Sequence, residues 1–196
     1  MCIRDRIKTE ALLKAYGRFV DSLGGRYLTA EDVGTTQHDM DVIREVTDAV
    51  TGTDPARGGS GDPSEATAEG VRWAIRAVVG SDDLAGLRVV ISGAGKVGSG
   101  LARRLVADGA VVVASDTDRS KVDRLRDELG VTIVDPAEAH RTPTDVFSPC
   151  ALGAVLNPKT IPELACTAVV GAANNQLAEP ADADRLEATG ITYAPD

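Results

Sequence analysis

RVVISGAGKVG, residues 88–98, is the stretch of the chain that decides its fold. The apolar, β-branched run 88–92 predicts a buried strand, and the pattern after it predicts an amphipathic helix over 97–108. Between them, Gly93 can take a tight turn, Gly95 can admit a pyrophosphate close to the backbone, and Gly98 lets the helix pack against the strand. The sequence therefore predicts a phosphate-binding turn made by Gly93, Ala94, Gly95, Lys96, Val97, Gly98 and Ser99.

A carboxylate follows the next predicted strand, at 111–115. Asp116, with Thr117 after it, stands close to the offset of about 20 residues at which an acid meets the adenosine ribose of a dinucleotide. A carboxylate accepts hydrogen bonds from a ribose 2′-hydroxyl and repels a 2′-phosphate, so Asp116 favours NAD over NADP. Arg119 leaves an alternative open: it is either an exposed residue of the first helical turn, which is the commoner case, or a cation that accepts a 2′-phosphate.

The region around the turn alternates predicted strands with predicted helices. That alternation is typical of a parallel sheet covered by helices on both faces. We therefore expect an α/β fold with a doubly wound, Rossmann-like, mostly parallel sheet. The expected strands are 88–92, 111–115, 131–134, 145–148, 167–171 and 190–193, and the expected helices are 97–108 and 119–129.

A smaller part of different character precedes this sheet. Apolar residues recur at helical spacing from Thr9 to Gly25 and again from Met40 to Val50, with a short strand candidate at 26–29. Residues 51–64, TGTDPARGGSGDPS, are dense in Gly and Pro and predict a loop.

The chain can accordingly be divided into parts. We expect an extraneous or disordered segment at 1–8, part of a larger N-terminal domain at 9–50, a hinge loop at 51–64 and an NAD-binding domain at 65–196. A helix over 65–79, capped by Ser64, would begin the last part. We also expect the chain to be a fragment that stops before its second domain is complete.

The composition narrows the class of protein. With 43% hydrophobic and 26% charged residues the chain is typical of a globular protein. Its formal net charge of -9 disfavours nucleic acid and anionic lipid as partners, and its apolar runs fall far short of the roughly 20 residues that span a bilayer. Cys2, Cys150 and Cys166 match no metal-ligand spacing, and no export signal accompanies them, so we expect a cytoplasmic protein without a bound metal.

Several further motifs carry a resemblance to a known family. They are YLTAEDVGTT (27–36), GDPSEAT (61–67), SPCALGA (148–154), GAANNQL (171–177) and YAPD (193–196), besides the turn GAGKVG. In this order and spacing the chain resembles the glutamate/leucine/phenylalanine/valine dehydrogenases over residues 9–196, and most nearly the leucine and valine branch. The resemblance implies NAD-dependent oxidative deamination of a branched-chain L-amino acid to a 2-oxo acid and ammonia. It also implies that residues 9–50 are part of an N-terminal catalytic and dimerisation domain, and that the protein is a homo-oligomer when the chain is complete.

The resemblance also implies roles for individual residues. Asp32 matches the family's catalytic aspartate, which moves protons to and from the substrate amino group; from the residues alone, the alternative is that Asp32 only caps the next helix. Cys150 is otherwise a small buried residue rather than a nucleophile. His38 and His140 match nothing catalytic, and we expect both at the surface. The residues that would meet the nicotinamide half of NAD are Thr67, Cys150, Ala151, Ala173, Asn174 and Asn175.

One part of the family pattern has no match in the chain. The family carries a glycine-rich segment with two substrate-binding lysines, and Lys8, Lys14 and Lys96 do not fit it. We therefore expect an enzyme of which this chain is an incomplete copy, with little activity by itself. The alternatives are a non-catalytic NAD-binding sensor, which would not need TAEDVGTT, and a shikimate-type dehydrogenase, which would not supply PCALG together with AANNQ.

Overall fold

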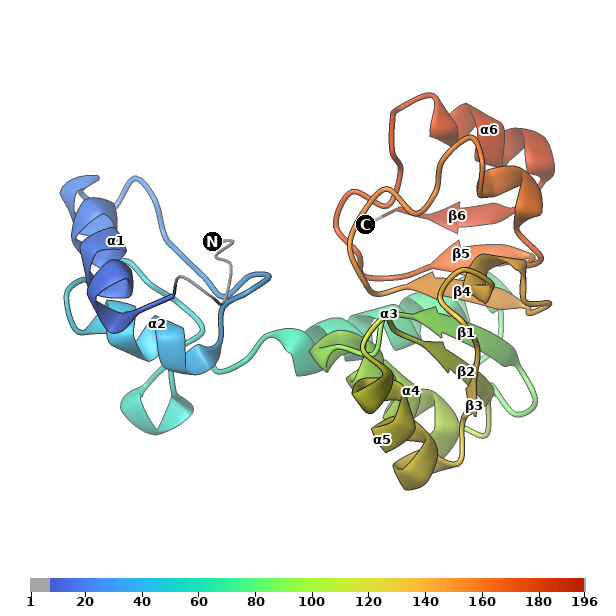
Figure 1. Cartoon of the computed structure of the whole chain (residues 1–196), viewed down its shortest axis with the longest axis horizontal. Helices are drawn as coiled ribbons and strands as arrows, with labels where there is room; N and C mark the ends of the chain where they lie inside the picture. The colour runs from blue at the N-terminus through green and yellow to red at the C-terminus, as the bar shows by residue number, and fades with distance from the viewer. Residues whose placement is uncertain (1–7, 196) are drawn as a thin grey trace. The chain divides into compact units, whose positions relative to one another are not determined.

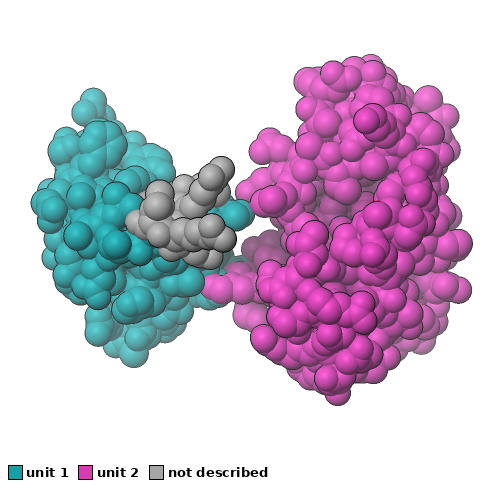
Figure 2. All heavy atoms as spheres, viewed as in Figure 1, with its two compact units in different colours: residues 1–63 teal, residues 64–196 magenta. Residues whose placement is uncertain are grey.

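The computed structural model describes residues 8–195, and the chain divides into two compact units, residues 1–63 and 64–196 (Figure 2). No helix within the described residues is both long enough and apolar enough to cross a membrane. Residues 1–7 of the segment expected to be extraneous lie outside the described residues, whereas Lys8 is described and contacts Asp39.

The larger unit is built on one six-stranded sheet (Figure 1). Its strands are β1 (Arg88–Ser92), β2 (Val111–Ser115), β3 (Thr132–Ile133), β4 (Val146–Pro149), β5 (Ala168–Val170) and β6 (Thr192–Ala194). The order is β3-β2-β1-β4-β5-β6, and every neighbouring pair is parallel. This is the strand order of a doubly wound dinucleotide-binding sheet, whose connections reverse direction between β1 and β4. The expected fold class is confirmed.

Side chains that alternate along the strands build a core on each face of the sheet. Val89 and Ile91 point to the face covered by α3 (Ser64–Val79), α4 (Lys96–Ala107) and α5 (Arg119–Leu129). Val90 points to the other face, which is covered by α6 (Asp182–Thr189) and two short 3-10 helices, η3 (Ala139–Arg141) and η4 (Ile161–Glu163). Burial on both faces explains why the strands are apolar runs rather than alternating sequences.

The smaller unit packs α1 (Glu10–Ser22) against α2 (Gln37–Arg44), followed by the 3-10 helix η2 (Pro55–Arg57). Gly17 allows this close approach, because a Cβ atom there would lie 2.5 Å from Cγ2 of Val46. The apolar core of the unit consists of Leu13, Met40, Val42, Ile43 and Val50. The strand expected at 26–29 is reduced to a single parallel bridge between Thr29 and Val50.

Candidate functional site

The turn between β1 and α4 uses its glycines in two different ways. Gly93 has φ 112, and a Cβ atom there would lie 2.6 Å from the backbone nitrogen of Ala151. A Cβ at Gly98 would overlap the carbonyl oxygen of Gly93. Around Gly95, by contrast, nothing lies within 4 Å of the Cβ position. The fold itself therefore requires Gly93 and Gly98, while the absence of a side chain at Gly95 leaves the backbone open to a group from outside.

The N-terminus of α4 lies at this open position. Gly95 is its N-cap residue and has no side chain with which to bond the first N–H groups of the helix. The first turn holds Lys96 and no acidic residue. Ser99 turns its hydroxyl back to the carbonyl oxygen of Ala94, at 3.0 Å, and Val97 packs against the apolar core. The helix thus presents N–H groups and the positive end of its dipole where an anion could bind.

Asp116 connects this turn to the one after β2. Its Oδ2 accepts a hydrogen bond from the Ala94 N–H at 2.8 Å, and its Oδ1 accepts one from the Asp118 N–H at 2.8 Å. The ammonium of Lys121, a residue that was not among the predicted site residues, lies 3.8 Å from Oδ1. The carboxylate is therefore held beside the glycine turn, where a carboxylate that binds a ribose would be expected. The Ala94 N–H, however, is already occupied by Asp116.

A cavity of about 240 Å³ opens beside Asp116 at the carboxyl ends of β2 and β3. Arg119 is on its wall, with a side chain that is 71% exposed and forms an ion pair with Asp123 at 3.2 Å. A second carboxylate, Asp135, also lines it. The cavity combines two acids with one exposed arginine, and its full lining is Asp116, Thr117, Arg119, Val122, Ile133, Val134, Asp135 and Pro136.

The loops after β4 and β5 come to the same edge of the sheet. The Cys150 N–H donates to the carbonyl oxygen of Ser92 at 2.8 Å, which joins the first loop to the end of β1. Ala151 lies against Gly93. The N–H of Ala173, in the second loop, donates to the carbonyl of Pro149 at 2.9 Å. The structure thus brings Cys150, Ala151 and Ala173 together with the glycine turn, and the adjacent Asn174 and Asn175 are exposed.

The cysteines of this unit are not placed for nucleophilic chemistry. Burial raises the pKa of the Cys150 thiol, and its sulfur lies 3.6 Å from the hydroxyl of Ser148. Burial likewise raises the pKa of Cys166, to about 11. Both thiols are protonated at neutral pH, and a thiol is a much weaker nucleophile than a thiolate.

The loop that carries Asp32 belongs to the smaller unit and does not use Asp32 as a helix cap. Oδ1 of Asp32 accepts a hydrogen bond from the adjacent Val33 N–H at 2.7 Å, and its backbone N–H and carbonyl both bond the hydroxyl of Thr35. The cap of α2 is Thr36, in a reciprocal capping box with Asp39. The helix-cap alternative for Asp32 is therefore wrong, because a Thr and an Asp with the correct spacing follow it. The Asp32 side chain is exposed.

Asp39 and Lys8 support this loop, a role that was not predicted for either residue. The Lys8 ammonium donates to Oδ2 of Asp39 at 2.8 Å and to the carbonyl of Gly34 at 3.2 Å. Burial acts to raise the pKa of Asp39, but hydrogen bonds from Lys8 and Thr36 outweigh it and hold that pKa below its usual value. The S/T-x-x-D/E spacing of Thr36 and Asp39 was the signal that could have identified the capping box.

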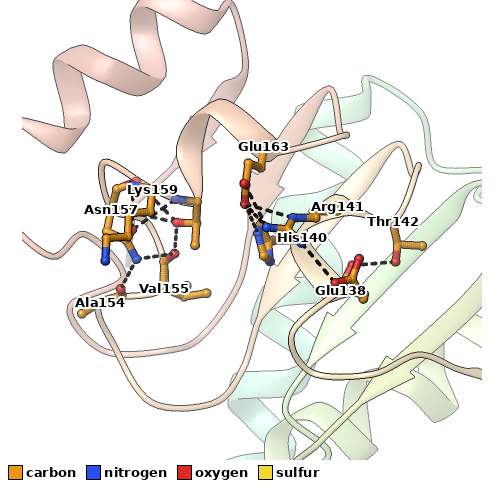
Figure 3. Close-up of polar contacts among 10 residues, drawn as sticks. Glu138, His140, Arg141, Thr142, Ala154, Val155, Asn157, Lys159 and Glu163 are labelled. Carbon is orange, nitrogen blue, oxygen red and sulfur yellow. Dashed lines mark hydrogen bonds and ion pairs between the residues drawn. The ribbon is translucent and has the colours of Figure 1, made fainter.

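Thr67, His38 and His140 are the remaining residues for which the sequence predicted a position or a role. Thr67 is exposed in the first turn of α3. His38 is exposed as expected, whereas His140 is only partly exposed: its side chain is 12% exposed, and its Nε2 lies 2.9 Å from Oε2 of Glu163 (Figure 3). Arg141 bonds both oxygens of the same carboxylate. This cluster joins η3 to η4, so His140 has a structural role that its sequence neighbours did not reveal.

The strand order and the glycine turn at the switch point define an α/β protein with the doubly wound fold that is typical of dinucleotide-binding domains. A profile described as glutamate/leucine/phenylalanine/valine dehydrogenase matches residues 58–122, which include α3, the turn, α4 and Asp116. The chain is 46% identical over 193 residues to a leucine dehydrogenase of Geobacillus stearothermophilus, covering 96% of this chain and 53% of that protein. It is 46% identical over 199 residues to a valine dehydrogenase of Streptomyces albus, covering 98% of this chain and 55% of that protein.

A solved structure agrees with these matches. The crystal structure of L-tryptophan dehydrogenase from Nostoc punctiforme superposes with a TM-score of 0.73 at 38% identity, over 97% of this chain and 55% of that one. Over nearly its whole length the chain is therefore homologous to amino-acid dehydrogenases of the glutamate/leucine/phenylalanine/valine type. It spans about half the length of the relatives it matches.

Proposed function

We propose that the protein to which this chain belongs catalyses NAD-dependent oxidative deamination of a branched-chain L-amino acid. The observation that best supports NAD as the cofactor is the open Gly95 position at the N-terminus of α4, with Asp116 beside it. The similarity to leucine and valine dehydrogenases supports a branched-chain amino acid as the substrate. The products are the 2-oxo acid and ammonia.

The residues at this edge of the sheet fit NAD. Backbone N–H groups at Gly95–Gly98 would hold the pyrophosphate, since the protein's own packing leaves that side empty. Asp116 would bond the adenosine ribose, and Asp135 would add to the repulsion of a 2′-phosphate in the same cavity. When bound, the nicotinamide ring supplies the acceptor for the hydride that leaves the substrate α-carbon. The residues that would contact that half are Thr67, Cys150, Ala151, Ala173, Asn174 and Asn175.

Asp32 is the proposed proton-transfer group. Its exposed carboxylate would accept a proton from the substrate ammonium before the α-carbon loses its hydride, and would return protons as water replaces the amino group. In the overall reaction the α-carbon gives up one hydride, protons come from the amino nitrogen and from water, the oxygen of water becomes the oxo group, and ammonia is released. Val33 and Thr35 would keep the loop, and hence the carboxylate, in one position.

We also propose that the complete protein is a homo-oligomer, since a structural neighbour, a glutamate dehydrogenase of Thermus thermophilus that is 25% identical, is described as hetero-hexameric. Light scattering of the purified protein would measure its assembly state.

The test of the function is turnover by the complete protein. We expect NADH to form with leucine and valine, little with glutamate, and much less NADPH when NADP replaces NAD. This chain alone should bind NADH but turn over little leucine, because no lysine of the described residues matches the family's two substrate-binding lysines. Holding the substrate in position lowers the barrier of a well-oriented reaction by up to about 7 to 11 kcal/mol. NADH binding by the complete protein without turnover of any amino acid would contradict the proposal and indicate a sensor.

A further inference from the structure

The loops after β4 and β5 form one structural unit, which we call the two-loop unit (residues 150–156 and 171–177). The Ala154 N–H donates to the carbonyl of Asn175 at 2.8 Å, and the Leu156 N–H donates to the carbonyl of Gln176 at 3.0 Å. A parallel bridge pairs Leu156 with Leu177. Gly153 makes the approach possible, because a Cβ atom there would lie 2.6 Å from the carbonyl oxygen of Asn175.

Backbone strain is concentrated at the centre of this unit. Ala154, with φ 62, and Asn175, with φ 52, are the two non-glycine residues of the described chain with a positive φ, and they share the hydrogen bond just named. Left-handed conformations cost energy for residues with a Cβ atom and persist where the surroundings fix them, often at binding sites. Figure 3 shows one such support: Nδ2 of Asn157 donates to the carbonyl of Ala154 at 3.1 Å.

Gln176 provides the side-chain support from inside the second loop. Its side chain is fully buried, and Nε2 donates to the carbonyl of Gly171 at 3.2 Å, across the turn that carries Asn174 and Asn175. Its Oε1 is buried and has no hydrogen-bond partner among the described residues. A buried acceptor without a partner destabilises a fold, so an apolar residue of the same size would be better for packing alone. The hydrogen bond to the Gly171 carbonyl is the contact that the Gln176 amide makes and that an apolar side chain could not make.

From this geometry we propose that Gln176 is a positioning residue for the nicotinamide half of the dinucleotide. The proposal rests on the proposed function, which gives Asn174 and Asn175 to that half. Gln176 does not touch the ligand; it holds the turn in the shape that the ligand meets. Its loss therefore weakens binding of the nicotinamide half and leaves the adenosine half, on the other side of β1, unchanged.

The test compares two probes, NADH and ADP-ribose, which shares the adenosine and pyrophosphate groups but lacks nicotinamide. Calorimetry measures both affinities for the wild-type chain and for Gln176→Met, which keeps the length of the side chain and removes its donor. We expect NADH affinity to fall by about tenfold, because a turn that has lost the Gln176 hydrogen bond must be ordered again when the nicotinamide half binds, while ADP-ribose affinity stays within about twofold. Ser115→Ala is the matched control, since Ser115 is a buried residue at the end of β2 whose hydroxyl also has no partner among the described residues. Its ratio of affinities should equal that of the wild type.

A second variant covers the case in which Gln176→Met does not fold. Ala154→Gly removes no polar group, and glycine accepts φ 62 without strain, so this variant should fold and loosen the same unit. We expect it to weaken NADH relative to ADP-ribose by a smaller factor. If the variants bind both probes but lose affinity for both equally, or for neither, the role of Gln176 is overturned and the proposed function is not. If the wild type binds neither probe, the proposed function fails and takes this inference with it.

Discussion

Asp32 and Asp39 show how two carboxylates of one short segment acquire different roles from their surroundings. Asp39 is 5% exposed, accepts hydrogen bonds from Thr36 and Lys8, and completes the cap of α2. Asp32 is exposed on the loop before it. A buried, paired carboxylate contributes to stability, whereas an exposed one on a braced loop is available for proton transfer. The two aspartates can be separated by experiment.

The prediction at this scale is that each aspartate affects a different measurement. In the complete protein, Asp32→Asn should lower the rate of leucine turnover by roughly 10²- to 10⁴-fold, the usual contribution of a general base, and leave NADH affinity and the melting temperature unchanged. Asp39→Asn should lower the melting temperature, because it breaks the pair with Lys8. Unchanged turnover in Asp32→Asn would remove Asp32 from the mechanism.

At the scale of elements, α3 and α4 are joined by ion pairs as well as by apolar packing. The guanidinium of Arg72, on α3, bonds both oxygens of Asp108, the C-cap residue of α4, at 2.6 and 2.7 Å. That pairing holds the pKa of Asp108 below its usual value, although desolvation opposes the shift. Arg104, on α4, reaches back to Glu65 and Glu69 on α3. The helix that opens at the glycine turn is thereby fixed to the helix that begins the unit.

This pairing predicts a pH-dependent stability. Arg72→Met should reduce the unfolding free energy by about 1–3 kcal/mol at pH 7, since it leaves a largely buried carboxylate with only Arg76. Because the folded pKa of Asp108 is depressed, its contribution is present above the unfolded value near 3.9 and is lost as pH falls through the folded value. The difference between wild type and variant in urea unfolding should therefore shrink below about pH 4. The exposed Arg126→Met serves as control, and an equal loss of stability there would contradict the argument.

Elements were predictable where a repeating pattern marks them and were missed where it does not. The six strands and helices α4 and α5 fall within two residues of their expected ranges, because β-branched runs and helical spacing are both strong there. Helix α6 was not predicted: Leu186 is the one buried apolar residue within it, so its sequence shows no apolar stripe. Likewise the sequence could not show that Gln176 is buried, since that depends on how two loops distant in the chain pack together.

At the scale of the whole molecule, the unit at 64–196 carries the features of a dinucleotide site on one edge of its sheet. The glycine turn, Asp116 and the two-loop unit follow β1, β2, β4 and β5, which bring them to the carboxyl ends of neighbouring strands. Asp32 lies in the other unit. Cofactor binding can therefore be measured independently of catalysis, and both the proposed reaction and the proposed role of Gln176 require it.

The most direct test compares NADH binding by Gly95→Val and Gly70→Val. Both glycines have no atom within 4 Å of the Cβ position and neither has a positive φ, so the protein should tolerate both changes. We expect Gly70→Val, on α3, to bind NADH like the wild type, and Gly95→Val to lose affinity by a factor on the order of a hundred or more, because valine would occupy the position of the pyrophosphate. Circular dichroism would confirm that both variants are folded. Wild-type affinity in a folded Gly95→Val protein would contradict the assignment of this turn as the cofactor site.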